Sequence, residues 1–205
     1  MLLVEELSLP HGKKVSVSFE AGVSYGLTGP NGSGKSLLLK SLAHLLPTTF
    51  KSFTYQGKSV LEYSPEQYRS SVLYLPSVPS VTDQLSVEDY ISLPLKMAVY
   101  KNHRSSFAAD SYIKRFGLEG KTLSHLSSGQ KQVLSFLRAM TLKADVLLLD
   151  EPTSHLDPAM TQELESLLLE WKNSDSRRSF VLVSHHDEQV RRLTQIQYAL
   201  SSITL

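Results

Sequence analysis

A run of eight residues near the N-terminus has the types and spacing of a loop that holds a polyphosphate. The run is Gly29-Pro30-Asn31-Gly32-Ser33-Gly34-Lys35-Ser36. Its glycines let the backbone wrap around phosphate with the N–H groups turned inward, and a helix that starts directly after the loop would add partial positive charge. In this pattern the lysine reaches the β- and γ-phosphates, and the hydroxyl group after it binds Mg²⁺. The run therefore predicts a nucleotide site in which Lys35 and Ser36 have these two roles.

Two carboxylates, Asp150 and Glu151, follow the apolar stretch Val146–Leu149. Many buried strands end in an acidic residue, so this pattern is weak by itself. It gains force from the phosphate loop upstream, because such sites use one carboxylate to hold Mg²⁺ and a second to take a proton from the attacking water. We therefore expect Asp150 to bind the metal and Glu151 to act as the general base of a Mg²⁺-dependent hydrolysis.

A second segment rich in serine and glycine, Leu126-Ser127-Ser128-Gly129-Gln130, precedes another expected helix. By itself it fits an ordinary helix cap at least as well as a second anion site. The spacing favours the anion site, because Gly129 and Asp150 are 150 − 129 = 21 positions apart. That distance leaves room for one helix and one buried strand between the two segments.

With this spacing the chain resembles the ATP-binding cassette (ABC) family, the ATP-binding subunits of ABC transporters and their soluble relatives. The resemblance covers essentially the whole chain and rests on an ordered series of motifs. Residues 29–36 are similar to Walker A, 126–130 to the LSGGQ signature with Ser128 in place of its first glycine, 146–150 to Walker B, and 154–157 to the D-loop. Ser184-His185 resembles the switch segment, and Arg138-Ala139 and Pro152-Thr153 also match.

The resemblance implies a site that is shared between two molecules. In this family two cassettes pair head to tail, and each ATP lies between the Walker A loop of one and the signature of the other. Glu151 would polarise the attacking water, His185 would hold the γ-phosphate, and Asp157 would couple the two sites. His186 follows directly, and we choose His185 because it has the family's position after the strand. The implied nucleotide contacts are Gly29, Pro30, Asn31, Gly32, Ser33, Gly34, Lys35, Ser36 and Leu37 of one molecule and Ser127, Ser128, Gly129 and Gln130 of its partner.

One departure from the family pattern concerns the metal. Most members carry a glutamine near Mg²⁺ after the strand that precedes the helical lobe, and here Val72–Pro76 is followed by Ser77. Ser77 could reach the metal through a water, the cation could be held less completely, or the loop could tolerate serine with little effect. Gln84 lies seven positions on, past Pro79, and is a poor substitute.

A second departure concerns the adenine, which family members usually stack on an aromatic residue near the first hairpin turn. In this chain His11 is the only ring at that turn. Either His11 stacks on the base more weakly than tyrosine would, or it is a plain turn residue exposed to solvent. Neither departure affects Lys35, Asp150, Glu151 or His185, and we therefore expect an active ATPase.

Composition narrows the partners and the location. The chain has 21 basic and 20 acidic residues and a net charge of +1, so we expect no nucleic acid, which would need a basic face. It has no cysteine, hence no disulfide or thiolate metal site, which fits a reducing compartment. The N-terminal stretch lacks the features of a secretory signal, and no stretch approaches the roughly 20 apolar residues that cross a bilayer. We expect a cytoplasmic subunit, peripheral on the cytoplasmic face of the inner membrane.

Hydrophobic patterning predicts strands that alternate with helices. Strands are expected over 2–9, 15–19, 23–28, 71–75, 144–149, 180–184, 196–200 and 203–205, and a short strand and turn over 54–58. Helices are expected over 36–46, 87–100 with a break at Pro94, 106–116, 129–142, 159–173 and 186–194. This alternation favours an α/β fold with a mostly parallel, covered sheet. We predict a P-loop NTPase-type core with N-terminal antiparallel β-strands and an inserted α-helical lobe.

The length of 205 residues, of which 41% are hydrophobic, is enough to bury one core. We expect a single ABC ATPase domain over 1–205, with 1–76 and 130–205 as the core and about 77–129 as the helical lobe.

The leading functional hypothesis is the ATPase subunit of a membrane transporter whose permease is a separate chain, with a second ABC subunit completing a homo- or heterodimer. The alternative is a soluble cassette ATPase in protein or metal-cofactor assembly, such as an iron–sulfur system. Chromosome-maintenance ATPases need a long coiled-coil insertion, and the stretch between Lys35 and Leu126 is too short and has no heptads. Small GTPases need a guanine-reading Asn-Lys-x-Asp sequence, which is absent.

Overall fold

The computed structural model describes residues 1–10, 12–79, 84–100 and 105–204. Its larger sheet has the strand order β6 (Val72–Leu75), β7 (Val146–Asp150), β8 (Ser179–Val183), β3 (Ser24–Thr28) and β9 (Ile196–Ala199), with every neighbouring pair parallel. The second sheet is antiparallel, in the order β2 (Lys14–Phe19), β1 (Leu2–Ser8), β4 (Ser52–Tyr55) and β5 (Lys58–Ser59). The predicted fold class is confirmed.

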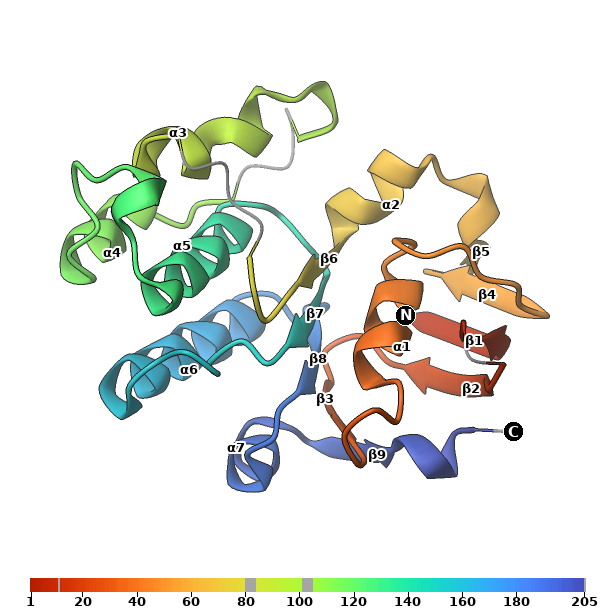
Figure 1. Cartoon of the computed structure of the whole chain (residues 1–205). Coiled ribbons are helices and arrows are strands. Elements are labelled where there is room, and N and C mark those ends of the chain that lie inside the picture. The colour runs from red at the N-terminus through yellow and green to blue at the C-terminus, as the bar shows by residue number, and fades with distance from the viewer. Residues whose placement is uncertain (11, 80–83, 101–104, 205) are drawn as a thin grey trace.

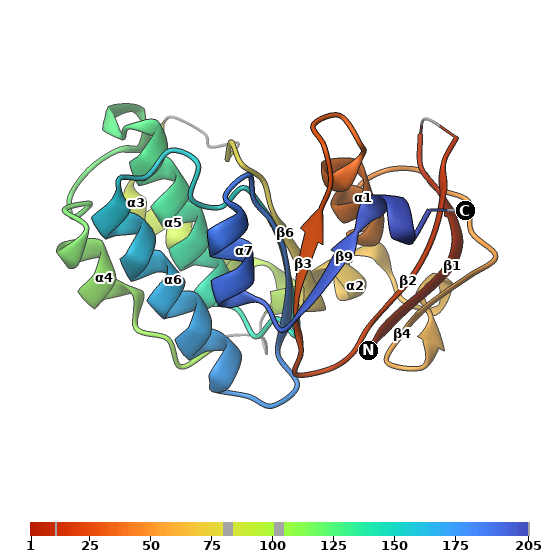
Figure 2. The same ribbon diagram turned by 90° about the horizontal axis from the view of Figure 1, so that it is seen from below.

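The α-helices are α1 (Lys35–Leu42), α2 (Pro65–Ser71), α3 (Val87–Ser92), α4 (Ala109–Arg115), α5 (Ser128–Met140), α6 (Pro158–Asn173) and α7 (Asp187–Leu193). Short 3₁₀ helices cover Val60–Glu62, Leu93–Lys96, Ala98–Tyr100, Leu123–His125 and Leu200–Ser202. Helices α5, α6 and α7 cover one face of the parallel sheet, and α1 lies on the other face beside the antiparallel strands (Figures 1 and 2). Among the described residues, no helix is both long and apolar enough to cross a membrane.

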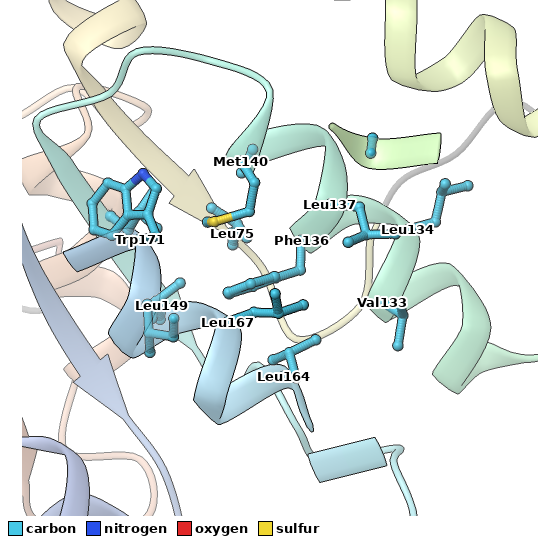
Figure 3. Packing of buried hydrophobic residues seen from close by; sticks show 14 of the residues in the cluster. Leu75, Val133, Leu134, Phe136, Leu137, Met140, Leu149, Leu164, Leu167 and Trp171 are labelled. Carbon is cyan, nitrogen blue, oxygen red and sulfur yellow. The ribbon is translucent and has the colours of Figure 1, made fainter. Parts of the chain in front are cut away.

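The central strand β7 shows how the two faces are built. Successive side chains of a strand point to opposite faces, and all five residues of β7 are buried. Leu147 and Leu149 join the apolar cluster of α5 and α6, whereas Val146 and Leu148 join the cluster of α1 and the antiparallel strands. Figure 3 shows the first of these clusters, in which Phe136 of α5 lies next to Leu167 of α6. The end of β7 is thereby fixed from both sides.

The helical lobe follows β6 and returns to the sheet through α5 (Figure 1). The expected helix over 87–100 is broken at Pro94, as predicted, because α3 ends at Ser92 and 3₁₀ turns follow. Lobe residues such as Val87 and Ile113 belong to the same apolar cluster as α5 and α6. The lobe and the core thus share packing, and the division at 77 and 129 stays a prediction.

One helix was missed, and one expected strand is wrong. Helix α2 was not predicted, although Ser64 caps it, Pro65 begins it, and Gln67 completes a capping box, which is a sequence pattern for a helix start. The expected strand 203–205 is absent over its described residues, because the chain turns into a 3₁₀ helix at Leu200. Only an isolated bridge between Thr204 and Val15 remains there, and residue 205 lies outside the described part.

Candidate functional site

The parallel strands end at the same edge of the sheet, which is where open α/β sheets bind their ligands. A pocket of about 400 Å³ lies at the ends of β7 and β8, against the start of α1. It is lined by Asn31, Gly32, Gly34, Lys35, Ser36, Leu37, Ser77, Asp150, Glu151, Val183 and His185. All of these residues except Val183 belong to the predicted site, so the fold brings together motifs that are more than a hundred positions apart.

The phosphate loop is closed on itself by its lysine. The Lys35 ammonium donates hydrogen bonds to the carbonyl oxygens of Gly29, at 2.7 Å, and Pro30, at 3.0 Å. Gly34 has φ of 108°, a left-handed conformation that strains residues with a side chain. No side chain caps the start of α1. The loop therefore turns a lysine and an uncapped helix N-terminus toward the pocket, an arrangement that suits a phosphate group.

Asp150 and Ser36 form the oxygen-rich corner of the pocket. The Ser36 hydroxyl donates a hydrogen bond to Oδ1 of Asp150 at 2.9 Å, and Asp150 is 4% exposed. Mg²⁺ prefers such hard oxygen ligands and usually takes one or two carboxylates together with substrate phosphates. Within the described residues no cluster of three or more His, Cys, Asp or Glu could hold a metal by itself. The donors thus fit Mg²⁺ brought in with a nucleotide.

Glu151 turns out of β7 toward His185. Its φ is 53°, a left-handed conformation that is uncommon outside glycine and often found at functional sites. Oε2 of Glu151 accepts a hydrogen bond from the His185 backbone N–H at 3.2 Å. The imidazole Nε2 of His185 lies 3.1 Å from Oε1, although without the geometry of a hydrogen bond. This pairing involves His185 rather than His186, which stands at the start of α7.

Burial raises the pKa of the Glu151 carboxyl above its ordinary 4.5, and the neighbouring His185 offsets part of this rise. A raised pKa suits a carboxylate that must accept a proton near neutral pH, because the proton is then held more firmly. A carboxylate in this position has the chemistry of a general base, and that role of Glu151 stays a prediction.

The signature segment lies outside this pocket, since none of residues 127–130 lines it. Ser127 and Gln130 form a capping box at the start of α5, in which each side chain accepts a hydrogen bond from the other residue's backbone N–H. Ser127 and Ser128 are exposed. Within one molecule the segment thus acts as a helix cap, and its contact with a nucleotide stays a prediction.

The start of α5 is packed directly on the loop that follows Glu151. A methyl group on Gly129 would come within 2.5 Å of the His155 carbonyl oxygen, so only glycine allows this approach. One turn further, the buried Gln132 donates to the Glu151 carbonyl oxygen at 2.7 Å and accepts from the His155 N–H at 3.2 Å. It also reaches the carbonyl oxygen of Ser77 at 3.3 Å. The signature helix is therefore bonded to the glutamate's own loop.

Gln132 was not predicted from the sequence, and neither was Tyr74, whose hydroxyl binds Asp150. The spacing of Gln132, three positions after Gly129, places both on one helix face and could have indicated it. Asp157 lies on the surface and caps α6 by accepting a hydrogen bond from Met160 N–H at 2.9 Å, and its coupling role stays a prediction. His11 lies outside the described residues, so its expected contact with the base cannot be placed.

A groove of about 380 Å³ lies beside the free edge of β6, between the helical lobe and α5. Its lining includes Leu93 and Met97, whose exposed fractions are 42% and 52%. The Arg138 guanidinium of α5 stacks 4.1 Å above the ring of Tyr90 in the same wall. Among the described residues, the lining of the groove is mostly apolar and aromatic and includes the cation of Arg138.

The fold and the pocket together define a P-loop nucleoside triphosphate hydrolase. The comparisons make the class specific. The family model for "ABC transporter" matches residues 12–154, which is more than half of the chain, and the chain belongs to this family.

Three relatives show how far the likeness extends. The phosphate import ATP-binding protein PstB of Saccharolobus solfataricus is 33% identical, covering 88% of this chain and 75% of that protein. The methionine import ATP-binding protein MetN 2 of Enterococcus faecalis is 34% identical, and the match spans 54% of its length. A solved structure of the "ATP binding subunit of ABC transporter" has the same fold, with a TM-score of 0.81 at 24% identity over 98% of this chain and 85% of that one.

The prediction of an ATP-hydrolysing subunit of an ABC transporter is confirmed at the level of the family. The curated relatives named above are import subunits, which favours the transporter hypothesis over a soluble assembly ATPase.

Proposed function

We propose that this chain binds ATP between its own phosphate loop and the signature segment of a second cassette, and that hydrolysis drives a permease on a separate chain. The observation that carries the proposal is the composition of the pocket. It contains Lys35, Asp150, Glu151 and His185, while the signature segment lies outside it. A chain with this division has one half of each of two sites.

In the nucleotide-bound state, Lys35 exchanges the carbonyl oxygens of Gly29 and Pro30 for β- and γ-phosphate oxygens. The start of α1, which no side chain caps, would offer backbone N–H groups to the same phosphates. Ser36 and Asp150 would hold Mg²⁺, with Ser77 close enough in the same pocket to contact it through a water. Bound there, the cation neutralises phosphate charge.

The hydrolytic step depends on the two side chains at the ends of β7 and β8. The Glu151 carboxylate accepts a proton from a water placed in line with the γ-phosphate, and the water oxygen attacks phosphorus while ADP leaves. His185 is exposed on the pocket side and donates a hydrogen bond to the γ-phosphate. Loss of that phosphate would leave the His185 imidazole beside Glu151, as it is in this structure.

The second cassette closes the pocket. The partner's Ser127 hydroxyl and Gly129 N–H would contact the γ-phosphate. Ser127 would then exchange the capping bond that it makes with the Gln130 N–H in one molecule. Gln132 bonds the signature helix to the loop of Glu151 in the same chain. A signature segment that contacts ATP in one site would therefore also affect the position of its own Glu151 in the second site. Asp157, exposed at the start of α6, would lie along the same interface.

The groove beside β6 is the proposed docking place for the permease, which would insert a short helix with an apolar face. Leu93 and Met97 supply the exposed apolar surface, and Arg138 supplies a cation for an acidic side chain or a helix C-terminus. This contact would hold the subunit on the cytoplasmic face of the membrane.

The substitution Glu151→Gln tests the proposed reaction. We expect hydrolysis to fall at least about a hundredfold, since the general base is lost, while ATP stays bound. The variant with ATP should run as a dimer of twice 22.9 kDa in light scattering. Glu170→Gln, on the exposed side of α6, is the matched control and should behave like the wild type. A wild type without ATPase activity, or a Glu151→Gln variant at full rate, would overturn the proposal.

A further inference from the structure

Asp150 is bonded through both of its carboxylate oxygens. Oδ1 accepts a hydrogen bond from the Ser36 hydroxyl at 2.9 Å, and Oδ2 accepts one from the Tyr74 hydroxyl at 2.8 Å. Ser36 is part of the phosphate loop, whereas Tyr74 belongs to β6 and has no role in the site described above. A carboxylate that is 4% exposed thus has one hydroxyl donor on each oxygen.

The sheet explains why Tyr74 reaches this carboxylate. Tyr74 pairs with Leu148 in the parallel register of β6 and β7, and Asp150 follows Leu148 by two positions on the same face of the sheet. The half-buried ring packs against the cluster that contains Leu38 and Leu42 of α1. The Tyr74 hydroxyl is the donor of this bond and Oδ2 of Asp150 is the acceptor.

We propose that Tyr74 is a positioning residue for the metal site, holding Oδ2 of Asp150 so that Oδ1 faces the Ser36 hydroxyl and the cation of a bound nucleotide. The assignment rests on the proposed function, in which Ser36 and Asp150 hold Mg²⁺. The Ser36 oxygen could offer a lone pair to the cation while its O–H still donates to Oδ1. The Tyr74 bond holds the other oxygen, Oδ2, so that the carboxylate cannot rotate freely. Such outer partners of metal ligands commonly change metal affinity by about 10- to 100-fold.

A purely structural role would have a different consequence. If Tyr74 only satisfied a buried carboxylate, its removal would lower the stability of the fold and weaken nucleotide binding equally with and without metal. If it positions Asp150 for the cation, its removal weakens only the part of nucleotide affinity that depends on Mg²⁺. The two roles therefore separate in a comparison of affinities with and without the metal.

The test uses Tyr74→Phe, which removes the hydroxyl and keeps the ring. Tyr63→Phe is the matched control, because it removes a hydroxyl that is bonded to the Tyr55 carbonyl oxygen at 3.2 Å, outside the pocket. The dissociation constant of a fluorescent ATP analogue is measured for the wild type and both variants, in excess EDTA and in saturating Mg²⁺. Thermal unfolding of each protein is recorded in parallel.

We expect Tyr74→Phe to bind the analogue like the wild type in EDTA and about tenfold more weakly in Mg²⁺, with Tyr63→Phe unchanged in both. Equal affinities of Tyr74→Phe and the wild type in Mg²⁺, or an equal loss in both conditions, would overturn the assignment of Tyr74 alone. A wild type whose affinity does not respond to Mg²⁺ would overturn the proposed function and this assignment with it.

Discussion

The phosphate loop and the signature segment are both rich in serine and glycine and both begin a helix, but they differ in helix capping and in their position relative to the pocket. The start of α1 has no side-chain cap and lies inside the pocket with Asp150 and Glu151. The start of α5 is capped by its own Ser127 and lies outside that pocket. An uncapped helix N-terminus inside the pocket can bind a phosphate group that enters the pocket of the same molecule. The start of α5 lies on the surface and has its Gln130 N–H bonded to Ser127. A ligand there would have to compete with this capping bond.

The comparison also shows what the signature helix does inside its own molecule. Through Gly129 and Gln132 it is packed and bonded onto the loop of Glu151. The same helix that would cover the partner's ATP therefore supports Glu151, which would act on the ATP bound by its own chain. This double attachment gives a physical reason why two half-sites would work together.

The largest expected difference between the two segments is in nucleotide binding. Lys35→Ala removes the charged donor at the phosphates, and we expect the affinity for ATP to fall about a hundredfold, as for the loss of a strong hydrogen bond between charged groups. Ser127→Arg should leave the affinity of the monomer within about twofold of the wild type, because Ser127 is not part of the pocket. Titration with a fluorescent ATP analogue at low protein concentration measures both. A comparable loss in Ser127→Arg would break the comparison.

The next effect is the pH dependence of the chemical step. Burial raises the pKa of Glu151 above 4.5, and the general base works only when it is ionised. The rate should therefore be full above the raised pKa and fall about tenfold per pH unit below it. Single-turnover rates at saturating ATP, measured from about pH 8 down to about pH 4, check this. A rate that stays constant down to pH 4.5 would contradict the role of Glu151.

A smaller effect is expected from Gln132→Leu, which leaves the Glu151 carbonyl and the His155 N–H without this partner. The free energy of unfolding should fall by about 1–3 kcal/mol, and kcat should fall more than the affinity for ATP, since the loop of Glu151 loosens while the phosphate loop does not. Gln162→Leu, on the exposed side of α6, is the control. Unchanged kcat in Gln132→Leu would show that the signature helix does not support the glutamate.

The smallest effect concerns the cap itself. Ser127→Ala removes the acceptor for the Gln130 N–H, and we expect the free energy of unfolding to fall by about 1 kcal/mol. Urea unfolding of the isolated monomer measures it. No change in stability would mean that the capping box in this segment does not stabilise α5.

The motifs were predictable from the sequence because each couples a residue type to a local backbone. Glycines mark the phosphate loop, acids mark the end of a buried strand, and the parallel sheet then brings Lys35, Asp150 and His185 to one edge. The lengths of β7 and α6 followed from apolar runs and periodicity. The secondary-structure prediction failed at two places with weaker local patterns. It gave a strand over 203–205, and it missed α2, although the capping box of this helix is present in the sequence.

Tyr74 could not be found in the same way, and for Gln132 the sequence offers only its spacing from Gly129. A tyrosine in a short strand and a glutamine in an amphipathic helix are compatible with many surroundings. Their roles appear only when β6 is paired with β7 and α5 is packed on the loop of Glu151. Long-range packing decides such contacts, and one sequence carries little trace of it.

The most direct test of a site shared between two molecules is complementation. Lys35→Ala and Ser127→Arg are purified separately, and the ATPase activity of each is measured alone and after mixing. Each variant should be inactive alone. A mixed dimer, however, joins the intact phosphate loop of the Ser127→Arg chain to the intact signature of the Lys35→Ala chain, so activity should reappear on mixing. A mixture that stays inactive while the wild type turns over, or a Ser127→Arg protein that is fully active alone, would contradict the account.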